Sequence, residues 1–172
     1  MSFVRALGCA ALALIISAAA ASAHVVLTQR SAPADSYFRA AFVVPHGCEG
    51  AATTKISIWL PEAILQARPQ VKPGWQIEIV REKLDNEVTG PHGEKITHRI
   101  AKVIFSGGNV PDDFFDEFVL QLRLPKQAGV FSFPVEQQCG DKVRRWSEIP
   151  APGQSAHDLE SPAAQLTVTE KR

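Results

Sequence analysis

This sequence lacks an excess of charge of either sign, because 18 basic residues are balanced by 18 acidic ones. Proteins that bind nucleic acids usually carry a basic excess or a basic stripe. Here the basic residues are interleaved with acids or occur in short pairs, as at Arg144 and Arg145, which is typical of a solvated surface. The sequence therefore predicts no nucleic-acid partner and no polybasic patch for a membrane surface.

Motifs of the common enzyme classes are also absent. The chain has no G-x-S-x-G elbow, no H-E-x-x-H pair and no glycine-rich phosphate loop. Hydrolases, zinc peptidases and nucleotide-binding proteins use these motifs to place a nucleophile, a metal or a phosphate. We therefore expect a binding protein and not an enzyme.

Only one long hydrophobic run occurs, from Ala6 to Ala20, and it follows a single early positive charge at Arg5. The run is too short and too rich in alanine for a typical membrane-spanning helix. It ends in the small residues Ala-Ser-Ala, which form a signal-peptide cleavage motif. We predict a signal peptide over residues 1–23 and a periplasmic or secreted mature protein. Residues 24–172 suit one domain, and they contain no hydrophobic membrane anchor.

Cysteine is scarce, and Cys9 leaves with the predicted signal peptide. Cys48 and Cys139 remain, and neither belongs to a C-x-x-C pair of the kind that zinc sites use. An even number of cysteines in an oxidising compartment favours a disulfide over a pair of metal-binding thiolates. We predict one Cys48–Cys139 disulfide, which closes a long loop.

Helical periodicity is largely missing after His24. Short segments instead alternate apolar and polar residues, as at Phe38, Ala40 and Phe42, and turns with glycine or proline separate these segments. This pattern predicts an all-β fold, an antiparallel β-sandwich or barrel. The segment "EAILQARPQ" is expected to form one short helical turn that ends at Pro69.

Cleavage after Ala23 would make His24 the first residue of the mature chain. A histidine in that position offers two donors, its free α-amine and its imidazole Nδ1, which can close a chelate ring around one metal ion. Such nitrogen donors favour tetragonal Cu(II). Protons compete only modestly at neutral pH, because the amine has a pKa of about 8 and imidazole one of about 6.5. On this pattern alone, a solvated histidine remains the alternative.

Four blocks in a fixed order give the mature chain a family resemblance. It resembles the YcnI-like secreted copper-binding domain family in "AHVVLTQRSAPADSYF", "RPQVKPGWQIEIV", "FSGGNVPDDFFDEFVLQLRLP" and "FPVEQQCGDKVRRWSEIPAPGQ". The resemblance implies a β-sandwich similar to the cupredoxin fold and a single-histidine brace for Cu(II) at His24. It also implies a nearby tryptophan, which by position is Trp146. Neutral indole has no free lone pair, so we expect Trp146 to adjoin the metal and not to bind it.

Copper held by two nitrogens needs further donors, so we expect a carboxylate or water to complete its square. Glu117 is the first candidate, because it begins a strand within one of the shared blocks, and Glu49 and Glu148 are the alternatives. The remaining histidines lie in turns or at the start of a strand, and we expect them to be structural: His46, His92, His98 and His157.

The sequence thus predicts a secreted protein that binds Cu(II) and acts in copper acquisition, buffering or transfer. Its expected partner is a copper transporter or another periplasmic copper-handling protein. Two alternatives stay open. One is a copper-dependent oxidative enzyme similar to polysaccharide monooxygenases, and the other is a metal-free adhesion or scaffolding β-sandwich.

Overall fold

The computed structural model describes residues 24–171, so the signal peptide predicted over residues 1–23 lies outside the described residues. The described chain forms β-strands joined by turns, with one 3₁₀ helix, η1 (Ala156–Asp158). The strands are β1 (Val26–Leu27), β2 (Ser31–Pro33), β3 (Tyr37–Val44), β4 (Thr53–Trp59), β5 (Ala67–Pro69), β6 (Gln76–Thr89), β7 (Lys95–Val110), β8 (Asp116–Arg123), β9 (Gly129–Phe133), β10 (Val135–Cys139), β11 (Lys142–Trp146) and β12 (Ala164–Thr169).

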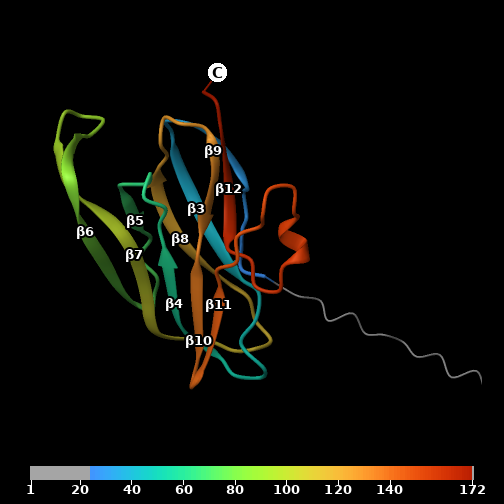
Figure 1. Ribbon diagram of the computed structural model, residues 1–172. Coiled ribbons are helices and arrows are strands. Elements are labelled where there is room, and N and C mark those ends of the chain that lie inside the picture. The colour runs from blue at the N-terminus through green and yellow to red at the C-terminus, as the bar shows by residue number, and fades with distance from the viewer. Residues whose placement is uncertain (1–23, 172) are drawn as a thin grey trace, which may run out of the picture.

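The strands form three sheets around one core, and the fold is the predicted all-β sandwich (Figure 1). The sheet orders are β1-β3-β8-β5, β11-β10-β4-β7-β6 and β2-β12-β9. Strands β9 and β10 are separated only by Pro134, so this segment passes directly from the three-stranded sheet to the five-stranded sheet. All pairings are antiparallel except that of β2 with β12, which is parallel.

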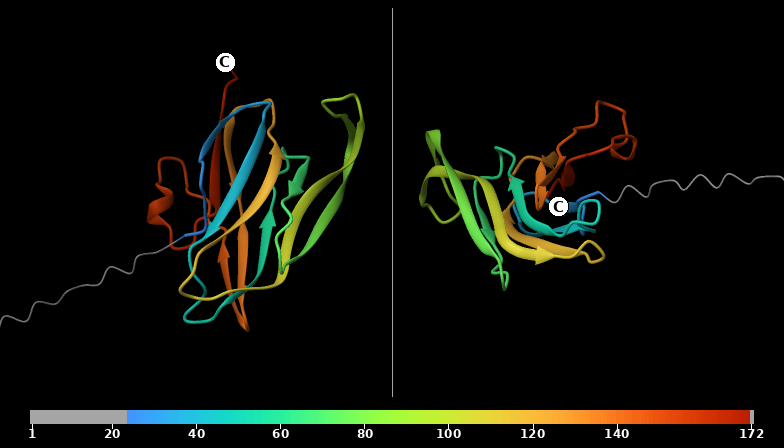
Figure 2. Two further views of the ribbon diagram at one scale, coloured as in Figure 1. Left: turned by 180° about the vertical axis from the view of Figure 1, so that it is seen from behind. Right: turned by 90° about the horizontal axis from the view of Figure 1, so that it is seen from below.

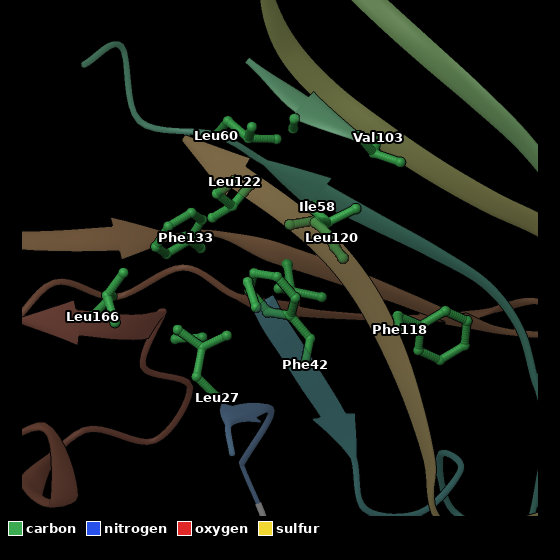
Figure 3. Close-up of a cluster of buried hydrophobic side chains, with 14 of the residues drawn as sticks. Leu27, Phe42, Ile58, Leu60, Val103, Phe118, Leu120, Leu122, Phe133 and Leu166 are labelled. Atoms are coloured by element: carbon green, nitrogen blue, oxygen red, sulfur yellow. The ribbon is translucent and has the colours of Figure 1, made fainter. Parts of the chain in front are cut away.

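The core confirms the alternation seen in the sequence. Phe38, Ala40 and Phe42 of β3 all point inward and are at most 5% exposed. Side chains from the three sheets meet in one cluster, in which Phe42 and Phe133 contact each other edge to face with ring centroids 5.5 Å apart (Figure 3). Burial of this apolar surface is the main force that holds the sheets together.

The expectation of a helical turn in "EAILQARPQ" is wrong. The Ile64 N–H donates to the Pro61 carbonyl (2.9 Å) in a simple turn, and Ala67–Pro69 then form strand β5. Proline is tolerated in this strand because β5 lies at the edge of its sheet, where a missing N–H costs no ladder hydrogen bond.

The β6–β7 hairpin is the longest in the protein, and its far end stands apart from the body of the sandwich (Figure 2). Near its base, Trp75 contacts the Phe118 ring with centroids 4.8 Å apart. The indole lies so close to Gly108 that a Cβ built there would come within 2.0 Å of it. Glycine at this position therefore makes room for an aromatic side chain.

Cys48 and Cys139 form the predicted disulfide, with Cα atoms 5.8 Å apart. It ties the loop between β3 and β4 to the end of β10. No helix among residues 24–171 has the length and apolar character needed to cross a membrane.

Candidate metal site

His24 is separated from β1 by one residue, Val25, and the residues that follow it anchor the chain to the core. Val25 and Leu27 are only 1% and 2% exposed, and Val26 pairs with Val43 of β3. These contacts fix the direction in which the backbone leaves His24. The His24 side chain itself is half-buried, on the N-terminal side of β1.

Trp146, the tryptophan that the family resemblance placed near His24, lies against the His24 side chain. It is the last residue of β11, pairs with Val135 of β10 and is 1% exposed. The indole and imidazole rings meet edge to face, with centroids 5.7 Å apart and planes at 60°. The Arg144 guanidinium carbon lies 5.3 Å from the indole centroid. The His24 imidazole is therefore flanked on one side by the buried indole ring of Trp146.

Gln137 holds this ring in place, and sequence reasoning did not identify it. Its side chain is 1% exposed and accepts a hydrogen bond from Trp146 Nε1 (3.2 Å). The same amide donates to the His46 carbonyl (2.7 Å) and to Thr53 Oγ1 (2.8 Å). A buried amide with all of these partners satisfied fixes the geometry around it. Period-two alternation in "VEQQC" would have placed Gln137 inside the fold.

We expected His157 to be structural, and the structure also places it beside the same pocket as His24. It lies on η1, where the Ser155 hydroxyl accepts from the His157 N–H (3.2 Å) and Ser155 N–H donates to Asp158 Oδ2 (3.2 Å). His24 and His157 line the same pocket, with a volume of about 170 Å³. The loop that carries η1 lies beside the start of the described chain in two views (Figures 1 and 2).

The surroundings favour a neutral His24 imidazole. Partial burial and, to a smaller extent, the charge of nearby His157 lower the pKa of His24 below its usual value of 6.5. A histidine must be unprotonated to bind a metal. The lowered pKa therefore keeps the imidazole lone pair available at neutral pH.

The structure does not bring Glu117 to this pocket. Glu117 pairs with Val43 in the β3–β8 ladder, and its carboxylate contacts the Arg39 guanidinium at 3.4 Å. Arg39 lies four residues from Val43, on the side of the ladder away from His24, because β1 pairs with the other end of β3. The register sets Glu117 level with Val26 across β3, but Glu117 does not line the pocket at His24 and its carboxylate contacts Arg39 instead.

The other two acids are also engaged elsewhere. Glu49 lies in the turn after Cys48 and pairs with Lys142 at 2.8 Å. Glu148 is closer, because its carbonyl accepts from the Ala163 N–H (2.9 Å), and Ala163 lines the pocket. Its carboxylate, however, accepts from the Ser161 N–H. Neither glutamate lines the pocket.

The described residues bring together only a few groups that could bind a metal. No group of three or more His, Cys, Asp or Glu side chains gathers to hold a metal within residues 24–171. Two imidazoles line one pocket, and cleavage before His24 would add its α-amine as a third nitrogen. Nitrogen donors of this kind suit Cu(II), and a tetragonal ion would keep at least one position for an outside ligand.

Residues 24–168 match a family described as a domain of unknown function, DUF1775. The chain belongs to the DUF1775 family. This is the domain family of the YcnI-like proteins, so the resemblance is confirmed at the level of the family. No curated protein matches this DUF1775 chain.

One solved structure supports the fold. An uncharacterized protein from Nocardia farcinica, described as having an immunoglobulin-like fold, is 29% identical, with a TM-score of 0.64 over 84% of this chain and 97% of that one. A putative membrane anchored protein from Corynebacterium diphtheriae is 9% identical, with a TM-score of 0.39 over 86% of this chain and 34% of its own. A family 123 glycoside hydrolase from Clostridium perfringens is 8% identical, with a TM-score of 0.35 over 83% of this chain and 22% of its own. The last two scores are too low to support any argument about this DUF1775 domain.

Proposed function

We propose that this DUF1775 protein is secreted and binds Cu(II) at His24 after cleavage of the bond between Ala23 and His24. The α-amine and imidazole of His24 would chelate the ion, and the protein would act in copper acquisition, buffering or transfer. The observation that carries the proposal is that His24 packs against Trp146 and lines one pocket together with His157.

Each residue has a separate part in this proposal. His24 binds the ion, and its lowered pKa reduces competition from protons. His157 is placed to offer another imidazole. Trp146 covers one side of His24 and excludes water there, which is how groups outside the coordination shell usually tune a metal. Copper, when bound, is the cargo of the protein.

Few protein donors and a position at the surface favour exchange over permanent storage. Metal bound by two residues, with a position left for water or another ligand, can be passed on by ligand substitution. We therefore propose that a copper transporter or another periplasmic copper-handling protein receives or supplies the ion.

The decisive experiment compares two forms of the protein that differ only at the terminal amine. Both begin at His24, and in the second form the α-amine is acetylated, so that it can no longer take part in the chelate. Cu(II) titration followed by calorimetry and electron paramagnetic resonance should give one tight site in the first form. Affinity should fall at least tenfold in the second. Equal affinities would contradict chelation by the amine.

His24→Ala and His98→Ala provide a matched pair of controls for this titration. His98 is an exposed histidine on the β6–β7 hairpin, where its Nδ1 contacts Thr97 Oγ1 (3.0 Å). The change at His24 should abolish tight binding, whereas the change at His98 should leave it intact. A protein that binds no stoichiometric copper in any form would instead support the adhesion or scaffolding alternative.

The position of His157 also keeps an oxidative enzyme as a second candidate. An N-terminal histidine together with a second histidine is the donor arrangement of copper-dependent polysaccharide monooxygenases. That activity requires turnover with a reductant and oxygen. Oxygen consumption by the copper-loaded protein that exceeds the rate of free copper, and that is lost in His157→Ala, would favour the enzyme over the carrier.

A further inference from the structure

The pocket at His24 has no acidic residue among the described residues that line it. Its polar lining consists of His24, Arg30, His157, Gln165 and Thr167. Cu(II) on neutral nitrogen donors carries two positive charges, and the Arg30 guanidinium adds a third. Uncompensated charges of one sign in a partly dehydrated space repel one another and lose hydration. A bound copper ion here therefore calls for an anion from outside the protein.

Arg30 is placed to recognise such an anion. It lies between β1 and β2, and its backbone carbonyl accepts from the Thr167 N–H (2.9 Å) of β12. The backbone is thus fixed beside the pocket, while the exposed side chain makes no ion pair with any residue in the range 24–171. A guanidinium with unused donors binds carboxylates through two parallel hydrogen bonds.

Two acids of the segment before β12 are occupied in holding its loop. Glu148 accepts from the Ser161 N–H, and Asp158 accepts from the Ser155 N–H as part of the cap of η1. A turn of either carboxylate into the pocket would break the hydrogen bond that shapes the loop carrying His157. An outside carboxylate can complete the site without that cost.

We infer that the site takes Cu(II) together with a small carboxylate, such as an amino acid or a dicarboxylate, held between the copper ion and Arg30. This inference rests on the proposed copper binding and names its substrate class. The pocket volume of about 170 Å³ is several times the ~30 Å³ that one water molecule occupies in the liquid, so a small carboxylate has room. The cargo is then a copper chelate and not the hydrated ion.

The test uses protein that begins at His24, loaded with one equivalent of Cu(II), and malonate labelled with ¹³C at its carboxyl carbons. Malonate is added while gel filtration checks that copper stays with the protein. We expect the electron paramagnetic resonance spectrum to change to that of a new species. The malonate concentration at half-conversion should be on the order of 1 mM or lower. Electron–nuclear double resonance should then detect ¹³C coupled to the protein-bound copper.

Arg30→Gln and Arg81→Gln form the matched pair. Arg81 is an exposed arginine on β6 that makes no ion pair among the described residues. Arg30→Gln should raise the malonate concentration at half-conversion about tenfold, which corresponds to about 1.4 kcal/mol, whereas Arg81→Gln should match the wild type. A wild-type spectrum that malonate leaves unchanged while copper stays bound would overturn the inference and leave the copper site standing. Equal malonate dependence in Arg30→Gln and the wild type would overturn the role of Arg30, and absence of copper binding at the outset would overturn both proposals.

Discussion

The indole of Trp146 meets the imidazole of His24 edge to face, with ring centroids 5.7 Å apart. Trp146 belongs to the five-stranded sheet and His24 precedes the first strand of the four-stranded sheet, so this contact joins two sheets at the candidate metal site. Any ion held by the His24 imidazole would lie within a few ångströms of the indole. The fluorescence of Trp146 should therefore report on metal binding at His24.

We expect Cu(II) to quench the fluorescence of Trp146 more than that of the other tryptophans. Paramagnetic copper quenches over short distances, and Trp75 packs instead against Phe118. In a titration of protein that begins at His24, Trp146→Phe should remove most of the quenching, whereas Trp75→Phe should preserve it. Quenching of equal depth in both variants would place copper elsewhere.

The buried Gln137 amide should contribute measurably to the free energy of unfolding. Gln137→Leu leaves the buried Trp146 N–H and the Thr53 hydroxyl without their amide partner, and such a loss costs about 1–3 kcal/mol for each unsatisfied group. We expect a fall of about 2–4 kcal/mol in the free energy of unfolding, measured with urea. Gln138→Leu on the neighbouring, partly exposed position should cost about 0.5 kcal/mol or less. Similar costs for both changes would contradict the role of the buried network.

The strands could be predicted because alternation reports directly on burial. Phe38, Phe42 and Ile58 each lie on the inward face that their spacing predicts. The disulfide could be predicted from the count of cysteines that remain after the signal peptide. These features depend on local sequence or on simple counting, and so one sequence was enough.

The rest of the candidate site could not be predicted, because it depends on the pairing of strands and on the path of a loop. Glu117 pairs with Val43 on β3 and its carboxylate contacts Arg39, and nothing local in the sequence sets that pairing or that contact. His157 reaches the site because Ser147 and Glu148 hydrogen-bond to the Ser161 carbonyl (2.9 and 3.0 Å) and so close the loop. Such a loop has no periodicity from which its path can be inferred.

The carboxyl group of Asp35 should make the stability of the fold depend on pH. Its hydrogen bond to Lys171 and the nearby charge of Arg123 lower the pKa of the Asp35 carboxyl. A carboxylate with a lowered pKa stabilises the fold above its unfolded pKa of about 3.9, and this contribution is lost as the pH falls through the lower, folded value. Asp35→Asn should therefore reduce stability at pH 7, and the difference from wild type should close as the pH falls through the lowered pKa of Asp35.

Asparagine is the appropriate substitution because Asp35 has a φ of 54°, and asparagine tolerates this left-handed backbone better than most residues. Lys171→Gln removes one of the two cationic partners and should give a smaller loss at pH 7. Urea unfolding of the three proteins at pH 7 and at low pH measures both effects. A difference between Asp35→Asn and wild type that is independent of pH would show that the charge of Asp35 does not contribute.

The Cys48–Cys139 disulfide should stabilise the fold mainly by restricting the unfolded chain. The bonded residues are 91 positions apart, and closing a loop of that length is worth about 4–5 kcal/mol in the chain-entropy model. The double variant Cys48→Ser and Cys139→Ser should lose about this much stability in urea and should bind Cu(II) as the wild type does, because neither cysteine lines the pocket at His24. A loss below about 1 kcal/mol would mean that the reduced chain keeps these segments together when unfolded. Loss of copper affinity in the folded variant would instead show that the bond supports the site, through the Thr53 hydroxyl that contacts both Cys139 Sγ and the Gln137 amide.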